Sequence, residues 1–251
     1  MRSRVLPVSI PFSVLAFLLR LTDFMDAALL VFAKVPRPGD VKTRLTPVLT
    51  PSEAARLYDA FLRDALQLYV ELAADVRLYL APPLPDEALT GFPDSLSVFE
   101  QAGSGLGTRM KRAFRDTLDD GYGRVCVVGT DHPTLPLSFI RQSFAALQSS
   151  GAVCIGPSED GGFYLLGMNA FYPQLFEGMS YSHDSVFTDT LARVGTTDAR
   201  LTVLPRWYDV DTPAELERML ADLEANEMEA PHTRQMVQQL QLHELSGTNE
   251  T

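Results

Sequence analysis

Four basic side chains stand close together in an otherwise acidic sequence. They are Lys34, Arg37, Lys42 and Arg44, and Asp40 is the one acidic residue among them. Two prolines and a glycine in the same segment prevent a helix and keep it open as a loop. Such cations at the end of a strand can bind phosphate groups. The alternative is a solvated basic loop, and the spacing is not that of a Walker loop.

Three aspartates stand in two further segments. Asp131 ends an apolar run, whereas Asp209 and Asp211 alternate just before a predicted helix. Carboxylates at one edge of a sheet can hold Mg²⁺, which prefers one or two of them together with phosphate oxygens and water. Asp131 can instead cap the following turn, and Asp211 can add charge at a helix N-terminus. Taken together, the three predict a site for Mg²⁺ (or Mn²⁺).

Two glycine-containing loops are also candidates. Gly105, Gly107 and Arg109 belong to a loop that opens a predicted helix, where free backbone N–H groups can bind an anion. Asp160 precedes two glycines between two apolar runs, and we expect it to lie near an acceptor. The Asp-Gly step there is equally typical of a hairpin turn.

The elements that position these residues alternate between strands and helices. Strands are expected over 28–33, 76–80, 96–99, 125–128, 152–155, 163–166 and 201–204. Helices are expected over 51–72, 106–118, 137–147 and 184–194 and from residue 213. Capping boxes begin the first helix, at Thr50 and Glu53, and the last, at Thr212 and Glu215. The alternation predicts a three-layer α/β/α fold with a mostly parallel sheet, whose carboxyl edge would carry the ligand.

Composition narrows the classes of function. The 251 residues are 46% hydrophobic, which is enough for one sizeable core. The net charge of −11 argues against a binder of nucleic acid or of anionic membranes. Cys126 and Cys154 lie in apolar runs and are expected to be buried free thiols on neighbouring strands. No CxxC pattern occurs, so zinc is not expected.

The chain divides into three parts. Residues 1–24 combine arginines with an apolar stretch that two prolines interrupt. We expect an extension, or a true start at Met25, and a signal peptide or weak membrane anchor is the alternative. Residues 25–230 would form the one folded domain, and 231–251 a peripheral tail. Nothing after residue 24 is long and apolar enough to span a bilayer, and a cytoplasmic protein is expected.

Five segments, in this order, resemble a glycosyltransferase-A-like family, the selenodomain-associated transferase type. The family pattern is FAK-x-P-x-P-G-x-VKTRL, Q-x-G-x-LG-x-RM, GTD-x-P, EDGG-x-x-L and DVDTP. The matching segments are Lys34–Leu45, Gln101–Met110, Gly129–Pro133, Glu159–Leu165 and Asp209–Pro213, and the resemblance covers roughly residues 27–225. The family is similar in fold to nucleotide-diphospho-sugar transferases, and more distantly to 2-phospholactate guanylyltransferase.

The resemblance implies that Asp131 and either Asp209 or Asp211 hold the metal, and that Lys42 and Arg44 touch phosphate. One segment departs from the pattern: Tyr181-Ser182-His183-Asp184 replaces the more usual Trp-Ser-Thr, on the acceptor side. We expect Ser182 to cap the next helix, which would place His183 in its first turn. A pocket residue at His183 is the alternative.

The expected function is a Mg²⁺-dependent transferase that uses a nucleotide-activated donor, with nucleotidyl transfer to a small acceptor. Lys42 and Arg44 would stabilise charge during in-line displacement, and Asp160 is the candidate general base. A glycosyltransferase that uses a nucleotide sugar is the first alternative. A catalytically silent nucleotide-binding module is the second.

Overall fold

The computed structural model describes residues 26–83, 96–225 and 230–242. A seven-stranded sheet forms its centre, in the order β3-β2-β1-β4-β6-β5-β7. The strands are β1 (Ala27–Ala33), β2 (Asp75–Leu80), β3 (Ser97–Glu100), β4 (Arg124–Val128), β5 (Ala152–Pro157), β6 (Phe163–Met168) and β7 (Arg200–Val203). All neighbours pair in parallel except β6, which runs antiparallel to both β4 and β5. The predicted mostly parallel α/β sheet is confirmed, and the predicted extension over 1–24 lies outside the described residues.

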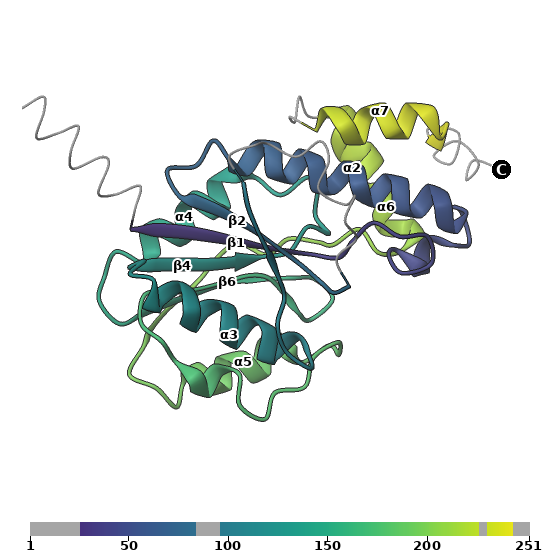
Figure 1. Cartoon of the computed structure of the whole chain (residues 1–251). Coiled ribbons are helices and arrows are strands. Elements are labelled where there is room, and N and C mark those ends of the chain that lie inside the picture. Colours follow the sequence, from purple (N-terminus) through teal and green to yellow (C-terminus); the bar gives the residue numbers. More distant parts are fainter. Residues whose placement is uncertain (1–25, 84–95, 226–229, 243–251) are drawn as a thin grey trace, which may run out of the picture.

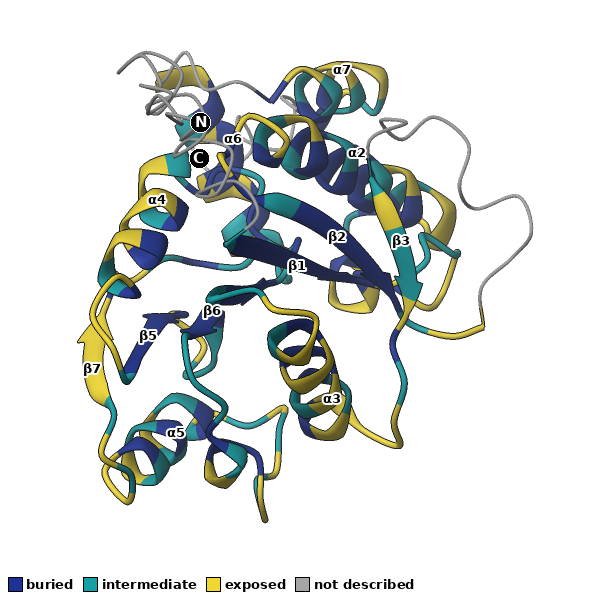
Figure 2. Cartoon of the chain, turned by 60° about the vertical axis from the view of Figure 1, so that its left-hand side comes forward, coloured by how far each residue is buried: buried dark blue, intermediate teal, exposed yellow. Residues whose placement is uncertain are grey.

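Helices cover both faces of the sheet (Figure 1). On one side lie α2 (Pro51–Tyr69), α4 (Leu137–Ala146), α6 (Pro213–Ala225) and α7 (Pro231–Gln239), and on the other α3 (Leu106–Asp119) and α5 (Val186–Val194). Alternate residues of β1 face the two sides: Leu29 and Val31 pack with α2 and α4, whereas Leu30 and Phe32 pack with α3. All seven residues of β1 are buried, as expected for a strand covered on both faces (Figure 2).

Local sequence explains where α2 begins. Thr50 Oγ1 accepts a hydrogen bond from Glu53 N at 3.3 Å, and Glu53 Oε2 accepts one from Thr50 N at 2.8 Å. Pro51 occupies the first turn, where its missing N–H costs nothing. The first predicted capping box is therefore formed, and in the second Glu215 Oε2 accepts from Thr212 N at 2.7 Å.

The two cysteines are free and buried, as predicted. They do not lie on adjacent strands, because β6 runs between them and its Gly167 pairs with both Cys126 and Cys154. The expectation of neighbouring strands failed because the antiparallel return of β6 inserts one strand between two others that precede it in the chain.

The tail helix is anchored by a buried carboxylate. Asp64 of α2 is 3% exposed, and its two oxygens accept hydrogen bonds from His232 N at 2.9 Å and Thr233 N at 2.7 Å. Asp64 therefore satisfies two N–H groups of the first turn of α7 from a different helix. Within the described ranges, no helix has both the length and the apolar character needed to cross a membrane.

We predict that Asp64→Ala lowers the free energy of unfolding by about 2 kcal/mol, because two buried N–H groups of α7 lose their acceptor. Urea denaturation measures the change. Asp59→Ala in the same helix is the matched control: it removes an ion pair with Arg63 (2.6 Å) and should cost no more than about 0.5 kcal/mol. Equal losses in the two variants would contradict the anchoring role of Asp64.

Candidate active site

A pocket of about 500 Å³ opens at the carboxyl ends of β1 and β4. The basic loop, the first turn of α3, the segment after β4 and the start of β6 all contribute to it. The lining includes Lys34, Asp40, Lys42, Arg44, Tyr58, Gln101, Leu106, Arg109, Asp131, Phe163, Tyr164, Ser182 and Asp211. This is the edge of an open α/β sheet at which ligands bind.

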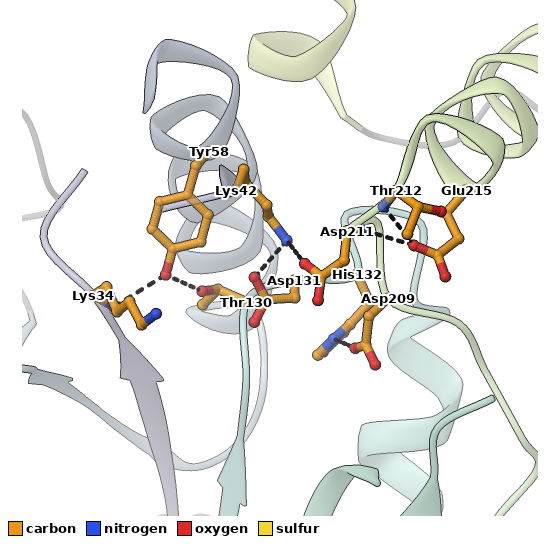
Figure 3. A network of polar contacts seen from close by, with 10 residues as sticks. All are labelled: Lys34, Lys42, Tyr58, Thr130, Asp131, His132, Asp209, Asp211, Thr212 and Glu215. Atoms are coloured by element: carbon orange, nitrogen blue, oxygen red, sulfur yellow. Dashed lines mark hydrogen bonds and ion pairs between the residues drawn. The ribbon is translucent and has the colours of Figure 1, made fainter. Parts of the chain in front are cut away.

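Lys42 lies between two of the predicted metal aspartates (Figure 3). Its Nζ is 2.5 Å from Asp131 Oδ1 and 2.9 Å from Asp211 Oδ1. The lysine side chain is only 1% exposed, whereas those of Asp131 and Asp211 are 46% and 39% exposed. Burial alone would lower the pKa of Lys42, but the two carboxylates raise it above its usual value. The ammonium is therefore charged at neutral pH.

Backbone and side-chain contacts hold the segment that carries Asp131. The Tyr58 hydroxyl of α2 lies 2.9 Å from Thr130 Oγ1 and accepts a hydrogen bond from Lys34 N at 3.0 Å. The carbonyl of Asp131 accepts from Val210 N at 2.8 Å. These contacts join the ends of β1 and β4 to the segment that carries Asp211. As a result, the carboxylates of Asp131 and Asp211 both reach the ammonium of Lys42.

Asp209 has a different partner from Asp211. Its Oδ1 is 3.4 Å from His132 Nδ1, and this pair lies below the Lys42 contacts in Figure 3. Burial raises the pKa of Asp209, but the contacts with His132 and Ser158 outweigh it, and the net shift is downward. The three predicted metal aspartates are thus brought to one region, but only two of them share a partner.

The carboxylates of the pocket suit a metal ion that phosphate oxygens help to hold. They do not suit a metal ion that protein side chains hold alone. No group of three or more His, Cys, Asp and Glu side chains placed to hold a metal occurs in the parts of the chain described. Asp131 and Asp211 each contact Lys42 through Oδ1 and remain partly exposed. Because Mg²⁺ takes one or two carboxylates and completes its shell with phosphate and water, these two residues suit it.

Three further cations line the pocket without an acidic partner among the described residues. They are Lys34, Arg44 and Arg109. Arg109 donates only to neutral oxygens, to the Gly103 carbonyl at 3.1 Å and to Gln101 Oε1 at 3.4 Å. Arg37 is directed elsewhere, since it donates to the Pro83 carbonyl at 3.0 Å and does not line the pocket. The described lining therefore carries four cations against three carboxylates, a small positive excess on a chain whose net charge is −11.

Gln101, to which no role was assigned from the sequence, fixes the base of the pocket. It is 6% exposed, and its Nε2 donates to the carbonyls of Ala33 at 3.1 Å and Tyr79 at 2.9 Å. The side chain thus joins the ends of β1 and β2 and turns its Oε1 toward Arg109. Tyr58 was likewise assigned no role, because the periodicity that predicts the helix over 51–72 does not show where a hydroxyl points.

The first turn of α3 borders the pocket. Gly105 occupies the N-cap position, and Leu106 lines the pocket, whereas Gly105 and Gly107 do not. A Cβ at Gly107 would overlap the ring of Tyr181. The glycine therefore lets this tyrosine lie against the helix, and anion binding by the backbone at Gly105 and Gly107 stays a prediction.

Asp160 lies in the turn between β5 and β6, which confirms the hairpin interpretation of the Asp-Gly step. Its Oδ1 accepts from Gly162 N at 2.9 Å. Burial raises the pKa of Asp160, and the negative charges of Asp209 and Asp211 add to the shift. The charges of Asp209 and Asp211 therefore act on the Asp160 carboxyl, although Asp160 does not line the pocket itself.

The helix start predicted at Ser182 is wrong. Ser182 has a left-handed backbone (φ 69) and lines the pocket, and α5 begins at Val186 with Ser185 in the N-cap position. The His183 ring accepts from Ser185 N at 3.3 Å, before the helix. The backbone of Asp184 packs so closely on Gly161 that a side chain at Gly161 would overlap it, and Phe187 N donates to the Gly161 carbonyl at 2.8 Å, so the chain before α5 follows the turn between β5 and β6.

Comparison with known proteins places the chain in a family. A protein from Desulfovibrio desulfuricans, provisionally described as a nucleotide-diphospho-sugar transferase, is 32% identical, with 86% of this chain and 96% of that chain covered and a TM-score of 0.78. The protein belongs to the nucleotide-diphospho-sugar transferase superfamily. Residues 65–183 of this superfamily member also match the family of uncharacterized proteins conserved in bacteria, DUF2064. The predicted family resemblance and the predicted fold are both confirmed.

More distant solved structures share the fold of this superfamily member. A cytidylyltransferase from Leptospira borgpetersenii is 12% identical over 90% of this chain and 98% of that chain, with a TM-score of 0.51. The 4-diphosphocytidyl-2C-methyl-D-erythritol synthase of Anaerococcus prevotii is 10% identical over 79% and 99% of the two chains, also with a TM-score of 0.51. None of the curated proteins matches the sequence significantly.

We predict that Gly161→Ala lowers the free energy of unfolding by at least about 2 kcal/mol. The residue has φ +90, and the added methyl group would meet the backbone of Asp184, which cannot move aside as a side chain can. Gly39→Ala is the control in urea denaturation, because Gly39 has a similar φ of +86 and open space around it. If both variants lose the same stability, the packing of Asp184 on Gly161 is not a constraint.

Proposed function

We propose that the protein is a Mg²⁺-dependent nucleotidyltransferase, which moves a nucleotidyl group from a nucleoside triphosphate to a small acceptor. One observation carries this proposal: Lys34, Arg44 and Arg109 face one pocket with their positive charges unpaired by any described residue. A triphosphate carries more negative charge than the diphosphate of a nucleotide sugar. Three unpaired cations in one pocket therefore favour the triphosphate.

The residues can be given roles in an in-line displacement at the α-phosphorus, in which an acceptor oxygen attacks and pyrophosphate leaves. Lys42 and Arg44 both line the pocket, and we assign them the stabilisation of the charge that develops on the phosphate oxygens. Asp131 and Asp211 would hold Mg²⁺, which supplies further charge neutralisation when bound. Asp160 is our candidate for accepting the acceptor's proton: its pKa is raised, and because it does not line the pocket, the acceptor would have to extend to the turn between β5 and β6 to reach it.

A glycosyltransferase is the second candidate, and one observation favours it. The protein that is 32% identical is provisionally described as a nucleotide-diphospho-sugar transferase. In this alternative the acceptor attacks the sugar carbon, and the nucleoside diphosphate leaves. The same cations would then neutralise a diphosphate leaving group, so the two candidates differ in the donor that binds.

Ligand-dependent thermal stability should separate these candidates. Nucleoside triphosphates and nucleotide sugars would each be tested, with and without Mg²⁺, on the full chain. A ligand at about 100 times its dissociation constant adds roughly 2.7 kcal/mol to the folded state, which is a readily measured shift. We expect Mg²⁺-dependent stabilisation by a triphosphate. Stabilisation by nucleotide sugars alone would favour the glycosyltransferase, and a shift with neither donor would contradict both candidates.

Arg44→Ala is expected to weaken binding of the stabilising nucleotide about tenfold or more, since a hydrogen bond to a charged group contributes about 1.5 kcal/mol or more. Isothermal titration calorimetry gives the dissociation constants. Arg37→Ala is the matched control, because it removes the same charge from the same loop at a side chain that bonds to Pro83 outside the pocket. If both variants weaken nucleotide binding equally, the effect comes from the total charge of the loop, and the specific contact of Arg44 is contradicted.

A further inference from the structure

The Asp131–Asp211 carboxylate pair already has a cation of its own. Lys42 Nζ contacts Oδ1 of both aspartates, at 2.5 and 2.9 Å, and its side chain is 1% exposed. These are the two residues that suit a divalent metal ion. The ammonium of Lys42 therefore lies between the two carboxylates that would hold such an ion (Figure 3).

The chain holds this ammonium firmly in place. Lys42 has a left-handed backbone (φ 48, ψ 36), which is uncommon for a residue other than glycine, and it leads into the short 3₁₀ turn Thr43–Leu45. Leu45 is fully buried, and its N–H donates to the Lys42 carbonyl at 2.9 Å. The rings of Tyr58 and Phe61 lie 5.7 Å from Nζ. Turn and rings together aim the side chain inward.

The charge of Lys42 limits which cations the Asp131–Asp211 pair can bind before the anionic donor is present. Two carboxylates carry two negative charges, and Lys42 neutralises one of them. A divalent ion would have to displace the ammonium or lie beside it, against repulsion at short range. An incoming polyphosphate changes this balance, because it offers the ammonium another partner and offers the metal additional oxygens.

We propose that Lys42 is a built-in competitor that keeps divalent metal ions off the Asp131–Asp211 pair of the free protein, so that the metal enters together with the anionic donor. The proposal deepens the proposed function, on which it rests for the identity of the donor. It concerns the order in which metal and donor bind at the same site.

Mn²⁺ alone is the probe, and no nucleotide is present. The full-length protein would be titrated with Mn²⁺, and free Mn²⁺ would be followed by electron paramagnetic resonance. The variants are Lys42→Met, Lys42→Met with Asp131→Asn, and Lys111→Met. The last is the matched control, because it removes one positive charge from a lysine that is ion-paired with Glu177 at 2.9 Å, outside the site.

Lys42→Met is expected to bind Mn²⁺ at least about tenfold more tightly than the wild type, since the competing charge is gone. Adding Asp131→Asn should abolish the gain, and Lys111→Met should bind as the wild type does. The proposal is overturned if the wild type already binds Mn²⁺ as tightly as Lys42→Met, if Lys42→Met gains nothing, or if the gain survives Asp131→Asn.

Circular dichroism and urea denaturation would show whether Lys42→Met is folded. If it is not, Lys42→Gln gives the same comparison, because it removes the charge and keeps a polar group near the carboxylates. The titration contains no nucleotide, so its outcome is independent of the donor screen. A failed donor screen would reject the proposed function and leave the Mn²⁺ comparison intact. A failed Mn²⁺ comparison would reject the competitor role of Lys42 and leave the donor screen intact.

Discussion

The buried ion pair of Lys42 with Asp131 and Asp211 is the interaction on which the site depends. The two contacts join residues that are 89 and 169 positions apart in the chain. A buried ammonium without partners would cost several kcal/mol, so Lys42 can occupy this position only when both aspartates are in place. The pocket therefore forms together with the tertiary structure, when the ends of β1 and β4 and the segment before α6 meet.

The direction of β6 explains why residues from both halves of the chain reach one edge. In a fully parallel sheet, the turn that carries Asp160 would need a long crossover before the chain could continue. The antiparallel return of β6 instead places this turn, and the amino end of the strand, beside the carboxyl ends of β4 and β5. Phe163 and Tyr164 consequently line the same pocket as the basic loop.

The strands, the start of α2 and the edge of the sheet that carries the pocket could be predicted from the sequence, because local sequence patterns determine them. Apolar runs and the box at Thr50 predicted the strands and the start of α2, and the position of the basic loop after β1 predicted its edge of the sheet. The sequence does not say which atoms meet across that edge. Asp209 and Asp211 were both candidates to join Asp131 at the metal, and the sequence could not show that Asp211 shares Lys42 with Asp131 whereas Asp209 contacts His132. The helix start predicted at Ser182 was wrong, because the local sequence does not show that the backbone of Asp184 packs on Gly161 in the turn between β5 and β6.

The cations of the pocket fall into two physical classes. Lys42 is buried, and its charge is neutralised by Asp131 and Asp211 for as long as these ion pairs persist. Lys34 and Arg44 are exposed, and their charges meet solvent. An anion approaching the pocket would thus meet the exposed charges first, with little desolvation, and the buried one last. Attraction of an anion and neutralisation of the acidic pair thus fall to different residues of one short loop.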